Sequence, residues 1–286
     1  MSHIGGGFDV TFHGVRGSTP CHGDTIARHG GNTSCVSVDV PGHDPVLFDM
    51  GTGLRYFGLG YPADRPFHGT CLLSHLHWDH VQGLPFFTPL LRPGGRLSVY
   101  APIQEDGRSL GAVINSCLCP PVFPVGLDAL PGVVDFTEVA DDRFAIGDIE
   151  VMSRLIPHVG NTCGYRLSWG GATVAYLSDH QQACGERYSM TDGARELCEG
   201  ADLLIHDAQY TAEEFLVKAT WGHCTIDYAV WLAIECGVKQ LALYHHDPMH
   251  DDAQIDGFVA DCAVKTEGTG LDVIAAREGL TLHVGD

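Results

Sequence analysis

Short apolar runs alternate with glycine-rich and polar turns in the first third of the chain. The runs are rich in β-branched and aromatic residues and have the length of ordinary strands. This pattern predicts strands at 8–13, 35–40, 46–49, 70–74 and 97–101. Between the last two, Leu84, Phe87 and Leu91 recur at helical spacing and predict a helix over 79–91, with Pro85 inside it.

The second half of the chain repeats the strand-rich pattern and adds helices. Strands are predicted at 149–156, 164–169, 173–178, 202–206, 240–244, 271–275 and 280–284, and helices at 211–218, 225–235 and 251–264. Two strand-rich halves joined by helices indicate an α/β protein of two sheets packed face to face with helices outside. Because no linker or shift in composition divides the chain, we expect a single domain over 1–286.

The segment at about 102–148 has a different character. Pro120, Pro121, Pro124 and Pro131 interrupt its apolar residues. Such a stretch is typical of a surface excursion, and we expect it to act as a lid.

Composition narrows the possible partners. The 286 residues include 16 Lys+Arg and 36 Asp+Glu, for a formal net charge of −20, which disfavours a long nucleic acid as ligand. The sequence has neither an apolar run long enough to cross a bilayer nor an export signal at its start, so we expect no membrane association and a cytoplasmic location. The 11 cysteines lack C-x-x-C spacing and suggest reduced, mostly buried thiols.

Histidine, with 17 copies, is unusually frequent, and it clusters in one motif. His75, His77, Asp79 and His80 form an H-x-H-x-D-H pattern directly after a predicted strand. Side chains alternate along an extended stretch, so His75 and His77 share one side, while the following turn lets Asp79 and His80 face a neighbouring position. One loop can therefore serve two metal ions; the alternative is a polar loop of hydrogen-bonded histidines.

The motif and four further landmarks resemble the metallo-β-lactamase superfamily. The landmarks are Ile156-Pro157-His158, Tyr176-Leu177-Ser178-Asp179, Leu243-Tyr244-His245 and Phe48-Asp49-Met50-Gly51-Thr52-Gly53. The resemblance implies an αββα sandwich with a metal site at the sheet edge. It further implies that His75, His77 and His158 hold one ion, that Asp79, His80 and His245 hold the second, and that Asp179 bridges them. His245 and His246 are adjacent, and the family pattern favours His245.

Other residues suggest a branch of this superfamily. A bridging aspartate at Asp179 resembles hydrolases of thioesters, lactones and phosphodiesters rather than true β-lactamases. Asp207 and the stretch His223-Cys224-Thr225 resemble the ribonuclease Z and phosphodiesterase branch, which implies that His223 is a general acid oriented by Asp207; the alternative is that His223 caps a helix. Ribonuclease Z carries a long tRNA-binding arm before the bridging aspartate, and here only 159–178 lies in that interval.

Two residues outside these motifs have alternative roles. Asp49 either accepts a hydrogen bond from the outer N–H of a metal-bound histidine or caps a turn. Arg16, in Gly14-Val15-Arg16-Gly17-Ser18-Thr19-Pro20, either binds a phosphate or anchors the N-terminal loop.

The resulting functional hypothesis is a hydrolase with two divalent metal ions that cleaves a small, possibly cyclic, phosphodiester by a metal-bound hydroxide. We expect Zn²⁺, with Mn²⁺ or Fe as alternatives. Asp79, His223 and Asp207 are the expected catalytic residues, with Asp79 also a ligand. The alternatives are a thioester, lactone or other carboxylic ester hydrolase on the same ions, and a non-catalytic nucleotide or metal sensor. The expected partner is the small phosphodiester substrate, with a homodimer as a further possibility.

Overall fold

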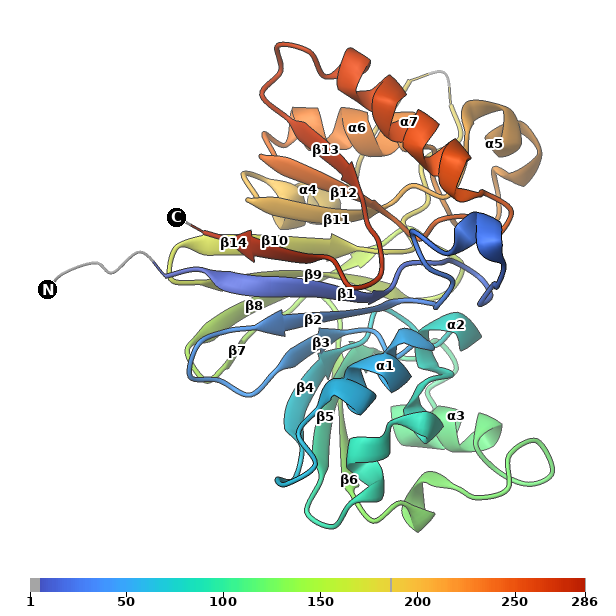
Figure 1. The fold of residues 1–286 in the computed structure, drawn as a ribbon, viewed down its shortest axis with the longest axis vertical. Coiled ribbons are helices and arrows are strands. Elements are labelled where there is room, and N and C mark those ends of the chain that lie inside the picture. The colour runs from blue at the N-terminus through green and yellow to red at the C-terminus, as the bar shows by residue number, and fades with distance from the viewer. Residues whose placement is uncertain (1–5, 186, 286) are drawn as a thin grey trace, which may run out of the picture.

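Two β-sheets of seven strands each form the centre of the protein (Figure 1). This computed structural model describes residues 6–185 and 187–285. The sheets pack face to face with helices on both outer sides, which confirms the predicted αββα sandwich. Within the described residues, no helix is long and apolar enough to span a membrane.

The first sheet has the strand order β14-β1-β2-β3-β4-β5-β6. The strands β3 to β6 run parallel to one another, whereas β14, β1, β2 and β3 pair in antiparallel fashion. Their bounds are β1 (Phe8–Gly14), β2 (Cys35–Asp39), β3 (Val46–Phe48), β4 (His68–Leu72), β5 (Arg96–Pro102), β6 (Val133–Val139) and β14 (Thr281–Val284).

The second sheet has the order β13-β12-β11-β10-β9-β8-β7. The strands β10 to β13 are parallel, and β7 to β10 form an antiparallel meander. Their bounds are β7 (Arg143–Ile146), β8 (Ile149–Ile156), β9 (Thr162–Trp169), β10 (Ala172–Leu177), β11 (Leu203–Asp207), β12 (Gln240–Tyr244) and β13 (Asp272–Ala275).

The helices cover the outer faces of the sheets. On the first sheet, α1 packs on β1 and β2, and α3 packs on β6; on the second, α4, α6 and α7 pack on β8 to β13. The α-helices are α1 (Gly53–Gly60), α2 (Trp78–Val81), α3 (Leu110–Cys117), α4 (Asp192–Cys198), α5 (Ala212–Lys218), α6 (Ile226–Glu235) and α7 (Asp252–Lys265). Short 3-10 turns are η1 (Asp24–Ile26), η2 (Leu84–Phe86), η3 (Thr88–Leu91) and η4 (Leu127–Ala129).

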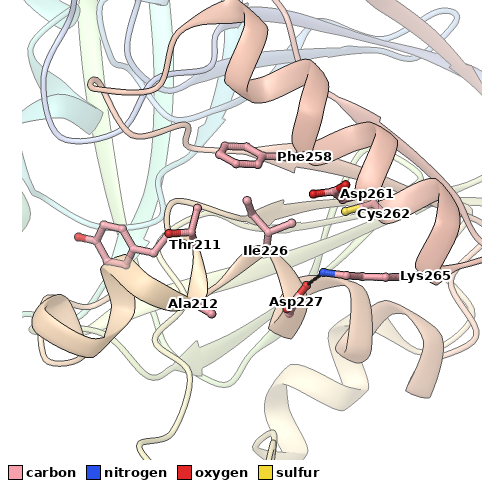
Figure 2. A pocket seen from close by; sticks show the side chains of 9 residues that line it. Thr211, Ala212, Ile226, Asp227, Phe258, Asp261, Cys262 and Lys265 are labelled. Atoms are coloured by element: carbon pink, nitrogen blue, oxygen red, sulfur yellow. Dashed lines mark hydrogen bonds and ion pairs between the residues drawn. The ribbon is translucent and has the colours of Figure 1, made fainter.

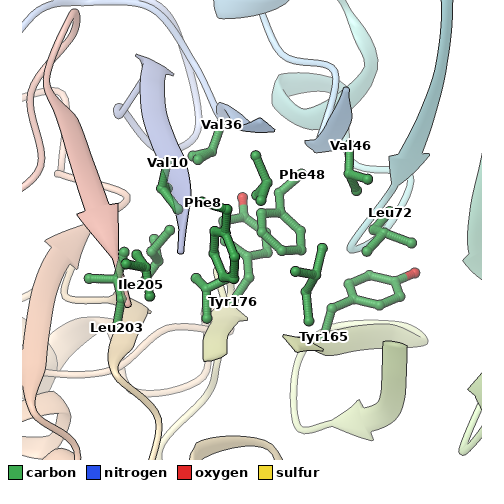
Figure 3. Close-up of a cluster of buried hydrophobic side chains, with 14 of the residues drawn as sticks. Phe8, Val10, Val36, Val46, Phe48, Leu72, Tyr165, Tyr176, Leu203 and Ile205 are labelled. Atoms are coloured by element: carbon green, nitrogen blue, oxygen red, sulfur yellow. The ribbon is translucent and has the colours of Figure 1, made fainter. Parts of the chain in front are cut away.

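An apolar layer between the sheets holds the sandwich together (Figure 3). Phe48 stacks on Tyr176 across this layer, with ring centroids 4.6 Å apart. Phe8, Val10 and Ile205 are also fully or almost fully buried here. Because one of these stacked rings, Tyr176, lies three residues before Asp179, the apolar layer fixes the strand end that carries this carboxylate.

Two regions differ from the sequence prediction. The helix expected over 79–91 is wrong: the structure has the single turn α2 followed by η2 and η3. Pro85 and Pro89 each lack the backbone N–H that a continuous helix needs, and each starts or extends a 3-10 turn instead.

The segment 102–148 is only partly an excursion. Its residues include α3 and two sheet strands, β6 and β7, which lie at the edges of the first and second sheets. The chain therefore crosses between the sheets at 140–142. The prolines had suggested loop structure, but they are confined to 120–131 and leave β6 free to pair with β5 along seven residues. What lies outside the sheets is the stretch 103–132.

Candidate metal centre

Strand ends from both sheets bring the predicted site residues together. His75 lies just beyond β4, His158 just beyond β8, Asp179 just beyond β10 and His245 directly after β12. Asp207 is the last residue of β11. The carboxyl ends of neighbouring parallel strands meet at one edge, so residues distant in sequence form one cluster there.

The first set of ligand-type atoms comes from His75, His77 and His158 with Asp179. One atom of each lies within 4.8 Å of the others. The Nε2 atom of His158 is 3.2 Å from Nδ1 of His77 and 3.5 Å from Oδ2 of Asp179, and Nε2 of His75 is 3.6 Å from the same carboxylate oxygen. We call His75, His77 and His158 the first set.

The second set comprises Asp79, His80 and His245, all buried. The Nε2 atoms of His80 and His245 lie 3.2 and 3.3 Å from Oδ2 of Asp79. Both nitrogens are also 3.1 Å from Oδ1 of Asp179. One oxygen of Asp179 thus faces the first set and the other faces the second.

These distances suit metal ligation. A tetrahedral zinc ion with bonds of about 2.0–2.1 Å separates its ligand atoms by about 3.3 Å, close to the 3.1–3.6 Å found here. In addition, Nε2 of His75 and Nε2 of His80 are buried without a hydrogen-bond partner. Such nitrogens are costly to leave unpaired, and both point to a missing bonding partner at the cluster. The donor set therefore fits two divalent ions.

Protonation favours the same role. Burial lowers the pKa of His75, His77 and His158 below the ordinary histidine value, which keeps these rings neutral and their lone pairs available. Neutral imidazole is the form that binds metal.

The carboxylates of the cluster are ionised. Burial works against ionisation of Asp179, but His245, His80 and His75 outweigh it and hold its pKa well below the usual range; the pKa of Asp79 is lowered in the same way. Burial likewise opposes protonation of His80, yet the surrounding carboxylates raise its pKa well above the ordinary value. The buried, ionised carboxylates of the centre therefore favour a positive charge beside them.

Asp49 supports the second set from behind. Its Oδ2 accepts hydrogen bonds from Nδ1 of His80 (2.7 Å), the Ser74 hydroxyl (2.9 Å) and the Tyr176 hydroxyl (2.6 Å), while Oδ1 accepts from the Ser74 amide (2.7 Å). In the neutral ring, a proton held on Nδ1 by Asp49 leaves the lone pair of Nε2 free and directed at the cluster. Of the two roles expected for Asp49, the contact with a candidate ligand histidine is the one observed.

Backbone strain also gathers at the second set. Among the described residues, Ser18, Asp49 and His245 have positive φ values without being glycine, at 61°, 61° and 57°. Ser18 and Asp49 bond to Asp79 and His80, and His245 is itself a member of the set. Such conformations cost free energy and persist where the surroundings enforce them, which is typical of functional sites.

His223 and Asp207 form a pair beside the centre. The Nδ1 atom of His223 lies 2.7 Å from Oδ2 of Asp207, and its ring stacks on His245 with centroids 5.0 Å apart. Burial lowers the pKa of His223, but Asp207 and the carboxylates of the centre outweigh this and raise it to about 9. The expected helix-capping role is filled by Thr225, whose side chain accepts a bond from the amide of Tyr228.

Glycine is required where the loop that precedes His223 meets the first set. Gly222 has φ +95°, and its carbonyl lies 2.6 Å from Nδ1 of His158. A Cβ atom at Gly222 would lie 2.4 Å from the His158 ring. The absent side chain therefore lets the backbone hold His158 with its Nε2 toward the cluster.

Arg16 anchors loops rather than facing the centre. Its fully buried guanidinium donates to the carbonyls of Gly30 (2.7 Å), His250 (2.7 Å) and Asp247 (3.2 Å). It joins the N-terminal loop to the segment after His245, which is the second of the two roles expected for it.

A separate crevice of about 150 Å³ lies between the starts of α5 and α6 and the helix α7 (Figure 2). Ile226, Phe258 and Cys262 give it an apolar wall, and Asp227 pairs with Lys265 at its side. None of the candidate ligands lines it, so this crevice is distinct from the cluster.

Two sheets between helices, with a His and Asp cluster at their strand ends, define the architecture of a class of metal-dependent hydrolases. The chain belongs to the beta-lactamase superfamily: the family model described as "Beta-lactamase superfamily domain" matches residues 46–246. The predicted resemblance is confirmed.

Individual relatives are similar along nearly the whole chain. A protein named ribonuclease Z from Natronomonas pharaonis is 26% identical in an alignment that covers 92% of this chain and 97% of that protein. The metallo-beta-lactamase fold protein YhfI from Bacillus subtilis has a TM-score of 0.72 at 19% identity, covering 97% of this chain and 99% of that one. A diphosphatase of the PhnP family has a TM-score of 0.69 at 19% identity, covering 99% of both chains. Family and relatives indicate a metal-dependent hydrolase.

Sequence reasoning missed two residues that touch the centre, Ser18 and Gln209. The amide of Ser18 donates to Oδ2 of Asp79 (2.8 Å), and Oε1 of Gln209 lies 2.8 Å from Nδ1 of His245. The only signal available was their position: Ser18 follows the conspicuous Arg16-Gly17, and Gln209 follows Asp207 by two residues.

Proposed function

We propose that the protein is a hydrolase with two divalent metal ions that cleaves a small phosphodiester. The observation that carries this proposal is the placement of Asp179, whose Oδ2 faces the first set and whose Oδ1 faces the second. In this proposal His75, His77 and His158 hold one ion, Asp79, His80 and His245 hold the other, and Asp179 bridges them. The donor set of imidazole and carboxylate suits Zn²⁺, with Mn²⁺ or Fe as alternatives.

The ions, when bound, supply an activated water and positive charge for the phosphate group. The chain itself supplies orientation and a proton. Asp207 binds Nδ1 of His223, so Nε2 is the nitrogen that delivers a proton to the departing alkoxide oxygen. The pKa of about 9 keeps His223 protonated at neutral pH, as a general acid requires. Asp207 thereby orients and stabilises the acid form.

A small substrate is favoured over a long RNA. The interval between His158 and Asp179 is filled by β9, β10 and their short turns, which leaves no insertion there to serve as an arm. The net charge of −20 repels a polyanion. The relative of the PhnP family is called a diphosphatase, whereas the Natronomonas relative is called a ribonuclease Z, so both substrate sizes belong in the assay.

The stretch 103–132 is the candidate lid. Phe123 packs against Phe86 near the turn that follows α2, with ring centroids 6.0 Å apart, and Asn161 donates to the carbonyl of Ile103 (2.9 Å). These contacts tie the stretch to segments that follow two site motifs. Exposed Val122 and Val125 give it an apolar surface toward which a substrate substituent could pack.

Comparative turnover tests the proposal. Purified protein, its metal content measured, is offered a bis(nitrophenyl) phosphate, a cyclic phosphodiester, a thioester panel and a precursor tRNA. We expect about two ions per chain and the highest kcat/KM on a small diester. Faster cleavage of thioesters would favour a carboxylic ester hydrolase, and faster cleavage of precursor tRNA would overturn the argument from charge. Binding without turnover of any of these substrates would favour a sensor.

A further inference from the structure

A chain of hydrogen bonds links two members of the second set through two residues outside that set. Nδ1 of His245 lies 2.8 Å from Oε1 of Gln209, Nε2 of Gln209 donates to the Ser18 hydroxyl (3.3 Å), and the Ser18 amide donates to Oδ2 of Asp79 (2.8 Å). Nε2 of His245 and Oδ2 of Asp79, at the two ends of this chain of hydrogen bonds, face each other at 3.3 Å, a separation that suits two ligands of one ion.

We infer that Gln209 and Ser18 are positioning residues that assemble the second metal site, and this rests on the proposed function. The amide oxygen of Gln209 can only accept, so it fixes the proton of His245 on Nδ1 and leaves Nε2 bare for an ion. The same amide then presents its N–H₂ to Ser18, which fixes the orientation of the Gln209 side chain.

Gln209 is well placed for this task. It is 3% exposed, and its own backbone amide donates to Oδ1 of Asp207 (3.0 Å), whose other oxygen binds His223. One residue therefore connects the candidate acid pair to the second set. A change at Gln209 that kept an acceptor would preserve the connection to His245, whereas one without an acceptor would not.

The backbone of 16–18 completes the arrangement. Gly17 lies against the His245 ring so closely that a Cβ atom would be 2.4 Å from its Nδ1 and 2.8 Å from Oε1 of Gln209. The amide of Gly17 donates to the carbonyl of His246 (3.0 Å), and the buried Arg16 holds the carbonyls of Asp247 and His250. The N-terminal loop thus presses on the second set and leaves the first set untouched.

The test compares binding of Zn²⁺ to the two sites by chelator competition in the full chain. We expect Gln209→Met to weaken one of the two ions by about 10- to 100-fold while the other keeps its affinity. Gln209→Glu, which retains the acceptor, should restore the affinity to near the wild-type value. Gln240→Met is the matched control, because Gln240 lies at the opposite end of β12 from His245.

A second pair of variants tests the loop independently. Gly17→Ala should lower the affinity of the same single ion, while Gly60→Ala, which has open space around its Cβ, should change neither. Thermal unfolding of the metal-free variants separates positioning from folding, since a purely structural role would lower the unfolding temperature and weaken both ions together.

The outcomes are separable. Wild-type protein that binds fewer than two ions overturns the proposed dinuclear site and this inference with it. Two ions in the wild type, with both affinities unchanged in Gln209→Met and Gly17→Ala, overturn the inference alone. Equal weakening of both ions, or no recovery in Gln209→Glu, also contradicts it.

Discussion

The two ligand sets of the centre differ in burial and in the support behind them. In the first set, His77 is exposed, whereas the side chains of His75 and His158 are buried. His75 contacts the Ser74 hydroxyl and His158 the Gly222 carbonyl through Nδ1. In the second set, all three side chains are buried, and each is held by a further residue.

The contrast predicts that the two sets differ in the rigidity of their ligands. A buried, strained and fully bonded set fixes the positions of its ligand atoms in advance, whereas the exposed His77 leaves the first set freer to adjust. His223, the proposed proton donor, stacks on His245 of the second set, so its ring is held against the more rigid set.

The largest effect on metal content and turnover is expected at Asp179, whose carboxylate both sets contact. Asp179→Ala removes both oxygens that the sets have in common, so we expect metal content to fall to one ion or less and turnover to fall to background. Elemental analysis and diester hydrolysis measure this. Retention of two tightly bound ions would contradict the bridging role, and Asp202→Ala on the same sheet serves as a control far from the cluster.

Removing one histidine from each set should show which histidine affects the stability of the metal-free chain in addition to its metal content. His80→Ala leaves the buried carboxylate of Asp49 without one of its donors, and breaking a buried pair costs about 3–5 kcal/mol. The three donors that remain from Ser74 and Tyr176 place the expected loss at the lower end. His77→Ala should lose an ion with little change in stability of the metal-free chain. Chemical denaturation of both metal-free variants checks this; equal stability would remove the contrast between the sets.

His223 is expected to affect chemistry without affecting metal content. His223→Ala should lower kcat by roughly 10² or more on diesters with poor leaving groups, because the proton donor is lost. On a nitrophenolate leaving group, which departs without a proton, the loss should be smaller. Metal content and kcat are measured on both substrates. Equal losses on both, with metal retained, would mean that His223 positions substrate or supports the fold.

The smallest effect is expected from the residue behind His80. Asp49→Asn keeps the size of the side chain but removes its negative charge, so the hydrogen bond that Nδ1 of His80 donates to it is weakened. We expect the affinity of one ion to fall by about 10- to 100-fold, with the other unchanged, in titrations with a competing chelator. Loss of both ions to the same degree would show that Asp49 supports the sheet ends in general.

The sequence was informative where chemistry and structure are local. The motif from His75 to His80 lies on one loop, and His158, Asp179 and His245 follow buried strands, so their strand-end placement could be read from periodicity. Most predicted strand bounds agree with the structure within two residues. The roles of the individual site residues stay predictions until ions are measured.

What the sequence did not provide depends on contacts between distant segments. The strands β6 and β7 are edge strands whose pairing with β5 and β8 is not visible in a proline-rich neighbourhood. The helix α1 is glycine-rich and weak in propensity, and it forms because it packs on β1 and β2. Gln209 and Ser18 carry no distinctive signal in the sequence. They lie 191 positions apart and are joined by a hydrogen bond only in the folded chain.

The distribution of the ligands along the chain sets an order for assembly during translation. His75, His77, His158 and Asp179 have all been synthesised by residue 179, so the residues proposed to hold the first ion are complete at that point. The second set is complete only when His245, which directly follows β12, has been synthesised 66 residues later. A polypeptide that ends between these two points has the whole first set but lacks the histidine on which His223 stacks.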